Sequence, residues 1–373
     1  MKICLVTEHF PPHIGGVEIA FHEYAKILSQ KGHTVRVITS NSGGITGKIN
    51  STNNLEIYHL KCKSFFGHPI ISKKELKKHI EWADIVHTTT FTAALPAVNL
   101  SCAYKKPCVI MVHEVLKEKW FQIEKNPVKA LAFLIFEKFV LSKKYTAWHT
   151  ISQATRNDLE KYKIPKEKIK LIYHGIDYNI WNNHIKEKSL NELFNIDKDD
   201  LIFFYSGRPG KTKGTFLLLE AINKIRNDIP KNFKFGFMLS KDPEEERISF
   251  EKIVRTHKLN NLIKISDSLP YQEIPAYRKN SFAFIVPSLT EGFGFSAAEA
   301  SALNIPIISS DTGSLPEVTS GKLLIFKSGD SNDLSRKILM ATQNKFNIIP
   351  EKKFYWNDSI IKIEKLYNEL LKK

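Results

Sequence analysis

The segment 282-FAFIVPSLTEGFGFSAAE-299 joins a short apolar run to a glycine-rich turn and then to a run of small, helix-compatible residues. An apolar run such as residues 282–286 is typical of a parallel strand that is covered on both faces. Glycines in the turn that follows let the backbone approach a neighbouring group closely. The segment therefore predicts a strand–turn–helix unit of a parallel α/β sheet.

The same alternation extends in both directions from this segment. Strands are expected at residues 3–7, 34–39, 55–60, 84–87, 108–113, 147–151 and 169–173 in the first half, and at 201–206, 233–239, 262–265, 282–286, 306–310 and 322–326 in the second. Helices are expected between them, for example at residues 16–31, 215–227, 245–257 and 296–303. Two successive series predict two doubly wound, Rossmann-like parallel-sheet domains.

The domain organisation follows from where each series begins and ends. The sequence predicts an N-terminal domain over residues 1–178, a polar linker over 179–200 and a C-terminal domain over 201–354. Residues 355–373 contain a last amphipathic helix. Ligands of such sheets bind beyond the carboxyl ends of the strands, so the residues just after each strand are the candidates for chemistry.

The charge balance, the apolar stretches and the cysteines indicate which kinds of partner and environment the protein has. The 373 residues include 55 Lys and Arg against 39 Asp and Glu, a formal net charge of +16. Residues 1–178 hold 26 basic and 15 acidic residues, which favours an anionic partner such as a phosphate, a nucleic acid or an acidic membrane surface. The apolar stretch 128–141 carries three charges and is not expected to span a membrane. Four cysteines without Cys-x-x-Cys spacing favour a reducing cytoplasm.

A basic loop follows the first strand of the second domain. Residues 207–214 read GRPGKTKG, and they place Arg208 and Lys213 beside the start of a helix. A guanidinium can bind phosphate oxygens in pairs, and a lysine ammonium adds a point charge. The spacing is not that of a Walker loop, in which Lys-Ser/Thr follows the last glycine. The loop therefore indicates a diphosphate site of another kind.

Two acidic residues follow the strand at 282–286. Glu291 lies in the glycine-rich turn and Glu299 lies about one turn into the next helix, so both can face one cleft. Carboxylates accept strong hydrogen bonds from sugar or ribose hydroxyls. The pair therefore predicts a site for a hydroxyl-rich ligand.

Two further candidates lie in the first domain. Gly15 and Gly16 open a helix after the first strand, where backbone N–H groups and the helix N-terminus favour an anion. His113 closes the apolar strand 108–113 at the edge where ligands bind.

In this order, these motifs resemble the family 4 glycosyltransferases, which have the GT-B fold, retain anomeric configuration and use nucleotide sugars. The matching residues are Gly15-Gly16-Val17-Glu18, His113, Ser152, Gly175-Ile176-Asp177, Arg208 with Lys213, the segment from Glu291 to Glu299, and Pro316-Glu317. The resemblance implies that the first domain binds the acceptor, that the second binds the donor, and that the last helix crosses back to the first domain.

The resemblance also implies residue roles. It assigns the donor site to Arg208, Lys213, Glu291, Gly292, Phe293, Gly294, Phe295 and Glu299, and the catalytic contacts to His113, Glu291, Arg208 and Lys213. The two cations would hold the diphosphate, Glu299 the ribose, and Glu291 with the adjacent backbone the sugar. His113 would contact that sugar near its 6-hydroxyl, and the amides of Gly15 and Gly16 would meet the phosphate or acceptor.

The activity implied is metal-independent transfer of a hexosyl unit from a UDP- or GDP-sugar in glycan or glycolipid biosynthesis, without a cofactor. Two positions depart from the family pattern: His174 stands where Asn is common, and Thr312 where a second Gly is frequent. The spelling Asp197-Lys198-Asp199 matches a metal-binding motif of other glycosyltransferases, but it lies in the polar linker and is interpreted as a solvated charge run.

The acceptor is suggested by composition. Residues 116–121 and 128–141 combine bulky apolar side chains with lysines. Such stretches can lie on an anionic bilayer, so they favour a lipid-linked acceptor and peripheral attachment to the cytoplasmic face of a membrane. The alternative is that residues 128–141 form an ordinary core helix.

Other enzyme classes remain open at this point. Gly292, Gly294 and Ala297 also spell a dinucleotide fingerprint, and Asp311 follows at the end of the next strand, as in an NAD-dependent oxidoreductase. A sugar-nucleotide epimerase or a phosphorylase could use a related double-Rossmann fold. No nucleic-acid-binding motif is present in the sequence.

Overall fold

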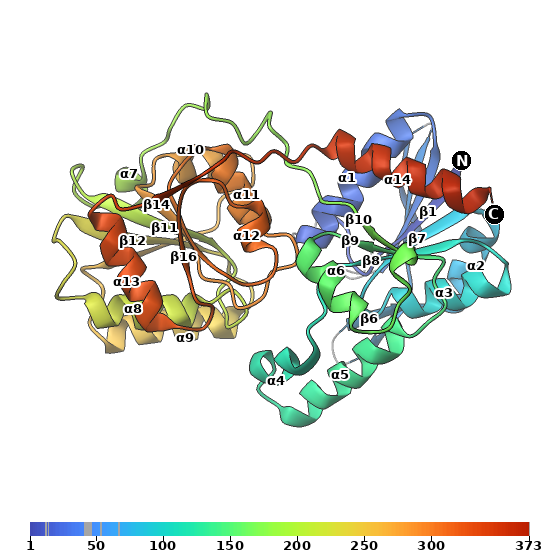
Figure 1. The fold of residues 1–373 in the computed structure, drawn as a ribbon, viewed down its shortest axis with the longest axis horizontal. Coiled ribbons are helices and arrows are strands. Elements are labelled where there is room, and N and C mark those ends of the chain that lie inside the picture. Colours follow the sequence, from blue (N-terminus) through green and yellow to red (C-terminus); the bar gives the residue numbers. More distant parts are fainter. Residues whose placement is uncertain (12, 14, 41–46, 53, 66–67, 373) are drawn as a thin grey trace. The chain divides into compact units, whose positions relative to one another are not determined.

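The apolar runs form two mostly parallel sheets, each in its own unit of the chain (Figure 1). The computed structural model describes residues 1–11, 13, 15–40, 47–52, 54–65 and 68–372. One unit comprises Met1–Gly175 with Phe354–Lys373, and the other comprises Ile176–Lys353. The predicted fold class is confirmed, including the return of the last helix to the first unit.

The sheet of the first unit has the strand order β10-β9-β8-β7-β1-β2-β4-β3. Its strands are β1 (Lys2–Val6), β2 (Thr34–Ser40), β3 (Gly47–Thr52), β4 (Leu55–Leu60), β7 (Ile85–Thr89), β8 (Cys108–Val112), β9 (Ala147–Thr150) and β10 (Ile169–Leu171). The edge strand β3 runs antiparallel to β4, and β5 (Cys62–Phe65) pairs with β6 (His68–Ile71) in a separate hairpin. Because β1 pairs with β2 on one side and β7 on the other, the strand order reverses between β1 and β7.

Helices of the first unit connect these strands, apart from a last helix that follows the second unit. They are α1 (Gly16–Gln30), α2 (Lys73–Trp82), α3 (Ala94–Ala103), α4 (Trp120–Ile123), α5 (Pro127–Leu141), α6 (Gln153–Glu160) and α14 (Trp356–Leu371), with short 3₁₀ turns η1 (Lys117–Lys119) and η2 (Lys166–Lys168). The expected helix 16–31 forms as α1, and Gly32 just beyond it has φ +88°, the left-handed conformation that ends many helices.

The sheet of the second unit has the order β13-β12-β11-β14-β15-β16-β17. Its strands are β11 (Leu201–Gly207), β12 (Phe233–Leu239), β13 (Ile263–Asp267), β14 (Ala283–Val286), β15 (Ile307–Ser310), β16 (Gly321–Phe326) and β17 (Asn347–Ile349). Its helices are α7 (Leu190–Phe194), α8 (Thr215–Ile225), α9 (Glu244–Thr256), α10 (Ile274–Lys279), α11 (Phe295–Ala302), α12 (Leu315–Val318) and α13 (Ser331–Thr342). The strand order reverses between β11 and β14, which pair directly.

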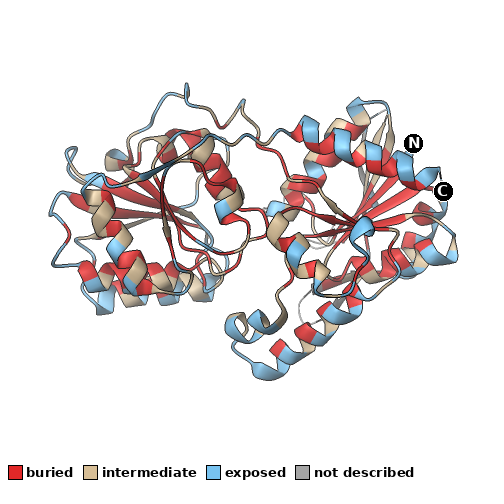
Figure 2. Ribbon diagram, in the orientation of Figure 1, coloured by how far each residue is buried: buried red, intermediate tan, exposed pale blue. Residues whose placement is uncertain are grey.

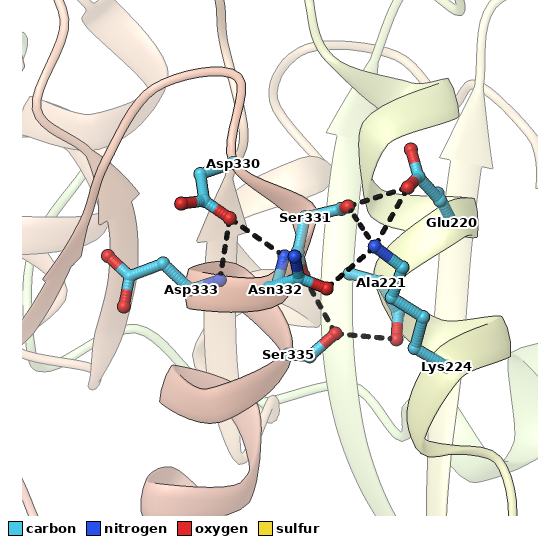
Figure 3. Close-up of polar contacts among 8 residues, drawn as sticks. All are labelled: Glu220, Ala221, Lys224, Asp330, Ser331, Asn332, Asp333 and Ser335. Carbon is cyan, nitrogen blue, oxygen red and sulfur yellow. Dashed lines mark hydrogen bonds and ion pairs between the residues drawn. The ribbon is translucent and has the colours of Figure 1, made fainter.

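Polar contacts fix α13 against α8 in the second unit (Figure 3). Asp330 caps α13 by accepting from the backbone N–H groups of residues 332 and 333. The hydroxyl of Ser331 donates to Glu220 over 2.7 Å, and the ammonium of Lys224 donates to Ser331 over 2.7 Å. The hydroxyl of Ser335 donates to the carbonyl oxygen of residue 221. These bonds satisfy polar groups between two helices whose apolar faces enter the same core.

The segment predicted as a linker, residues 179–200, belongs to the second unit. It carries large side chains that are buried there: Trp181 and Leu190 have no exposed surface, and Phe194 packs against Gly236 of β12. Burial of these side chains fastens the segment to the sheet.

The C-terminal helix α14 packs on α1 within the first unit. The hydroxyl of Ser359 donates to the carbonyl oxygen of Tyr173 over 2.6 Å. A Cβ atom added to Gly175 would lie 2.2 Å from the backbone nitrogen of Trp356, so this close approach requires glycine. The Gly175-Ile176-Asp177 motif therefore begins with a docking point for α14.

Candidate functional site

The second unit gathers the predicted donor residues where its strand order reverses. The loop after β11 carries Arg208 and Lys213, and the loop after the adjacent strand β14 carries Glu291. In open α/β sheets this reversal opens the crevice in which ligands bind. Topology alone thus brings together residues that lie about 80 positions apart in the sequence.

The basic loop is held by its own hydrogen bonds. The hydroxyl of Tyr205 donates to the carbonyl oxygen of Arg208 over 2.8 Å. The backbone N–H of Gly210 donates to the hydroxyl oxygen of Thr215 over 2.9 Å, which closes the loop onto the start of α8. Arg208 is exposed and Lys213 is half-buried. Both cations are therefore available to an anion that approaches this edge of the sheet.

Lys213 and Glu291 form an ion pair. The Nζ atom of Lys213 lies 2.9 Å and 3.2 Å from the two carboxylate oxygens of Glu291. The Glu291 side chain is the more buried partner, with 13% of its surface exposed against 33% for Lys213. Two of the predicted site residues are thus in direct contact, and each fixes the position of the other.

Gly214 and Gly313 allow close backbone contact with the loop that follows β14. A Cβ atom added at Gly214 would lie 1.8 Å from the carbonyl oxygen of Pro287, and one at Gly313 would lie 2.1 Å from that of Glu291. Gly214 has φ +67° and Gly313 has φ +53°. The backbone N–H of Leu289 also donates to the carbonyl oxygen of Thr212 over 2.8 Å. Glycine is therefore needed one residue beyond Thr312, the position at which the sequence departs from the family pattern.

We expect Gly214→Ala to destabilise the protein clearly more than Gly329→Ala. Gly329 also has a positive φ, +79°, but a Cβ atom there would meet nothing within 4 Å. Both variants bear the backbone penalty of roughly 1–2 kcal/mol, and only Gly214→Ala adds the collision with Pro287. Urea denaturation of the two variants measures the difference. Equal losses would mean that the two loops do not approach as described.

Glu299 lies deeper than the sequence suggested. It is 4% exposed, and one of its carboxylate oxygens lies 2.9 Å from a guanidinium nitrogen of Arg278. The hydroxyl of Tyr271 donates to the other oxygen over 2.9 Å and itself accepts from the indole nitrogen of Trp181 over 2.7 Å. Burial lowers the pKa of Arg278, and burial with the charge of Glu299 raises that of Tyr271.

Sequence reasoning missed Trp181, Tyr271 and Arg278. Arg278 also donates to the hydroxyl of Ser206 and to the carbonyl oxygen of Ser296, so it joins β11 to α11. Trp181 lies four residues beyond the Gly-Ile-Asp motif, whereas no motif marks the other two. An arginine that follows apolar helix residues gives no indication that it is 3% exposed.

The glycine-rich turn leads directly into α11. Gly294 is its N-cap and has φ +82°. Phe293 is buried, and its ring packs edge-to-face on that of Phe295, with 5.0 Å between centroids. The first N–H groups of a helix have no partner within it, so Gly292, Gly294 and their neighbours present a helix N-terminus beside Glu291.

In the first unit, Gly15 is the N-cap of α1 and Gly16 its first residue. The carboxylate of Glu18 lies against Gly15, 2.3 Å from where a Cβ atom would be, and accepts from His13 over 2.8 Å. Glu18 thus provides negative charge at this helix N-terminus itself. Pro12 and Ile14 of the same loop lie outside the described residues.

His113 follows β8 at the same edge of the first sheet. Its Nε2 atom lies 2.6 Å from the hydroxyl oxygen of Thr89, which donates its own hydrogen to the carbonyl oxygen of Thr90. Nε2 therefore carries the proton, and Nδ1 is left as an acceptor. Burial, with a smaller contribution from His149, lowers the pKa of His113 to about 3. The ring is a neutral hydrogen-bonding group.

Three buried histidines lie near His113. The ring centroids of His113 and His174 are 6.2 Å apart, and those of His87 and His149 are 5.4 Å apart. Tyr24 hydrogen-bonds to His174 over 2.9 Å and stacks on His87. Burial lowers the pKa of His149 to about 4 and those of His87 and His174 well below their usual range. The departure from the family pattern at His174 thus belongs to a neutral polar core.

This core makes stability depend on pH. Between pH 6.5 and 5 the unfolded histidines take up protons, whereas the folded ones, with lowered pKa values, do not. The free energy of unfolding should therefore fall as the pH falls through this window, in which carboxylates stay ionised. Urea denaturation at several pH values measures the slope, which should be smaller in His174→Asn. A flat profile would contradict the burial of neutral rings.

The Asp197-Lys198-Asp199 motif lies away from these loops. It precedes β11, at the amino edge of the sheet, whereas Arg208 follows the same strand at the carboxyl edge. Seven residues of strand separate the two edges by roughly 20 Å. The carboxylate of Asp197 accepts from the backbone N–H of Asp199 over 3.1 Å and so stabilises a local turn.

Asp311, which completed the dinucleotide fingerprint, accepts from the backbone N–H of Ser328 over 2.8 Å. Gly292 lies six residues beyond the end of β14 rather than in a tight turn directly after it. The structure thus offers little support for the oxidoreductase alternative.

Two family models match the chain: Glycosyltransferase Family 4 over residues 14–179 and Glycosyl transferases group 1 over residues 187–355. The O-antigen biosynthesis glycosyltransferase WclY of Escherichia coli is 24% identical over 353 residues, which cover 88% of this chain and 93% of that protein. A subunit of phosphatidylinositol N-acetylglucosaminyltransferase from Saccharomyces cerevisiae is 22% identical over 385 residues, covering 98% of this chain and 80% of that protein.

Solved structures share the fold. Sucrose-phosphate synthase from Thermosynechococcus elongatus superposes with a TM-score of 0.80 at 19% identity, covering 100% of this chain and 99% of that one. Anabaena HepE, crystallised with UDP and glucose, gives a TM-score of 0.74 at 15% identity, covering 99% and 100%. The two sheets, shared with these structures, form a fold of the GT-B type, and the two family models identify the chain as a glycosyltransferase. Within that class, the chain belongs to the family 4 glycosyltransferases.

Proposed function

We propose that this glycosyltransferase moves a hexosyl unit from a UDP- or GDP-sugar to an acceptor, with retention of anomeric configuration, in glycan or glycolipid biosynthesis. The observation that carries the proposal is the convergence of Arg208, Lys213 and Glu291 where the strand order of the second sheet reverses. The names of the relatives support the biosynthetic context, and the complex of HepE with UDP and glucose supports a nucleotide-sugar donor.

Arg208 and Lys213 act on the leaving group. Transfer breaks the bond between the anomeric carbon and a phosphate oxygen, which leaves an oxocarbenium-like sugar and a more negative diphosphate. Cations already in place at that oxygen stabilise the transition state more than the ground state. The ion pair with Glu291 holds Lys213 in position before the donor arrives.

Glu291 of the second unit contacts the transferred sugar, and His113 of the first unit is a hydrogen-bonding group for a sugar hydroxyl. The Glu291 carboxylate accepts from sugar hydroxyls while it stays paired with Lys213, and the backbone from Gly292 to Phe295 lines the same turn. His113 accepts a sugar hydroxyl hydrogen at Nδ1, because its Nε2 proton is directed to Thr89. A neutral ring is suited to this role, since a protonated ring has no acceptor nitrogen.

Retention proceeds at the front face of the sugar. The leaving phosphate oxygen takes the proton of the acceptor hydroxyl as that hydroxyl attacks from the same side. A covalent route would need a carboxylate free to attack the anomeric carbon. Both oxygens of Glu291 contact the Lys213 ammonium, which supports the front-face route. Trapping of a glycosyl adduct on Glu291 would refute it.

Glu299 holds the ribose. Tyr271 and Arg278 each occupy one of its carboxylate oxygens, and each oxygen keeps a second lone pair for a ribose hydroxyl. No metal ion takes part in this proposal, because Arg208 and Lys213 supply the positive charge that the diphosphate needs. Full activity after EDTA treatment is the expected result, and loss of activity restored by a divalent cation would contradict it.

The donor binds the second unit, and the first unit receives the acceptor through the loop at Gly15 and Gly16. We place the enzyme in the reducing cytoplasm, where free cysteines such as the buried Cys4 and Cys108 persist. The acceptor is lipid-linked in this proposal, in keeping with the exposed apolar side chains and the lysines of α5 in the first unit.

A thermal-shift screen across UDP- and GDP-sugars identifies the donor, because a ligand that binds only the folded protein raises the melting temperature. Product analysis with that donor then tests the reaction. Transfer of the sugar to a second molecule with unchanged anomeric configuration is expected. Release of a sugar phosphate in the presence of inorganic phosphate, or isomerisation of the nucleotide sugar, would instead identify a phosphorylase or an epimerase.

A further inference from the structure

Helix α5 carries an apolar stripe on its exposed side. Val128, Leu131, Ile135 and Phe139 are 75%, 48%, 58% and 48% exposed. Their spacings of three, four and four residues place them on one face of the helix. An exposed apolar face of this kind usually marks an interaction site.

The exposed stripe is not the face by which α5 packs against the core of its unit. The opposite face of α5 is buried against its own unit by Ala130, Phe133, Leu134, Glu137, Val140 and Leu141. Figure 2 shows buried and exposed residues alternating along the helix. The alternative interpretation, a simple core helix, accounts for this buried face and leaves the outer stripe unexplained.

Lysines flank the stripe. At about 100° per residue, Lys129 and Lys138 fall on opposite sides of it, and both are exposed. The ammonium of Lys143 lies 3.5 Å from the ring centroid of Phe139. The outer face of α5 therefore has an apolar centre and cationic edges.

The one acidic residue of α5 is turned away from this face. Glu137 is 6% exposed and accepts from the backbone N–H groups of Leu116 and Lys117, from the indole nitrogen of Trp120 and from the hydroxyl of Tyr162. Four donors compensate its charge. The bond from Trp120 fastens α4 to α5.

We infer that the outer face of α5 docks on an anionic lipid bilayer. Apolar side chains that enter the interface between lysines directed at anionic headgroups are the arrangement of interfacial helices. A second copy of this face is a poorer partner, because isologous pairing would bring like-charged lysine edges together. Among the described residues, no helix is long and apolar enough to cross a bilayer.

The inference deepens the proposed function, because a bilayer on this face would present a lipid-linked acceptor to the first unit. The test of bilayer docking needs neither donor nor acceptor, so the docking inference and the proposed function can fail separately. Flotation with vesicles of phosphatidylcholine and phosphatidylglycerol is compared with flotation on pure phosphatidylcholine. We expect binding to the anionic vesicles, reduced at high salt.

Ile135→Asp should reduce the vesicle-bound fraction roughly tenfold, because a charge replaces an inserted side chain. Ile361→Asp on α14 is the matched control. Ile361 is 56% exposed in the same unit, and its substitution should leave the vesicle-bound fraction unchanged. Lys129→Glu with Lys138→Glu tests the cationic edges if Ile135→Asp fails to fold.

Three results would overturn the inference. The first is that the protein does not float with anionic vesicles. The second is that Ile135→Asp and Ile361→Asp reduce the vesicle-bound fraction equally. The third is that the protein binds no vesicles but sediments as a dimer, which Ile135→Asp dissociates.

Discussion

Lys213→Ala and Arg208→Ala should each lower kcat by about a hundredfold while the protein stays folded. Removal of one preorganised group that stabilises transition-state charge commonly costs on the order of 3 kcal/mol. The loss should appear in kcat more than in KM, because the charge on the diphosphate grows during bond cleavage. Steady-state kinetics with the donor found in the thermal-shift screen measure both constants.

Lys211→Ala is the control for this prediction. Lys211 is an exposed lysine of the same loop, and removing it changes the net charge by the same amount. It should leave kcat close to that of the parent enzyme. Near-normal turnover in Lys213→Ala and Arg208→Ala, or an equal loss in Lys211→Ala, would refute a local role for the two cations.

Among the variants proposed here, Arg278→Met should lower the free energy of unfolding the most, by about 3–5 kcal/mol. The Arg278 and Glu299 side chains are 4% and 5% exposed, so removing the guanidinium leaves a buried carboxylate without its counter-ion. The ring centroids of Trp181 and Phe284 lie 4.5 Å and 4.3 Å from the guanidinium carbon of Arg278, so the two rings confine this side chain further. Urea denaturation gives the free energy of unfolding.

A double variant separates charge from packing. Arg278→Met with Glu299→Gln removes both charges, and it should recover much of the stability lost in Arg278→Met. The double variant should still bind the nucleotide weakly, because the introduced amide has one acceptor oxygen for the ribose hydroxyls where the carboxylate has two. If Arg278→Met is as stable as the parent, Glu299 is not held by the pair in solution.

The interior strands could be predicted from sequence because burial on both faces leaves an unbroken apolar run. β1 and β14 show this pattern. The strands β3 and β17 were missed, since both lie at sheet edges, where GKINST is polar and NII is only three residues long. Short edge strands are defined by the neighbour they pair with, which one sequence does not reveal.

The candidate site could be predicted only in part. Arg208, Lys213 and Glu291 lie in glycine-rich loops directly after strands, and the rule that ligands bind at the carboxyl edge made them candidates. The Lys213–Glu291 ion pair depends on β11 and β14 being neighbours, which only the strand order determines. Arg278 and His149 carry no local signal, because their roles come from burial among distant segments.

The most direct test of the central claim is a crystal structure of the protein with UDP or GDP, whichever gives the larger thermal shift. We expect the diphosphate to lie within hydrogen-bonding distance of the Arg208 guanidinium and the Lys213 ammonium, with ribose hydroxyls on Glu299. A nucleotide bound elsewhere, with Arg208 and Lys213 left in solvent, would contradict it.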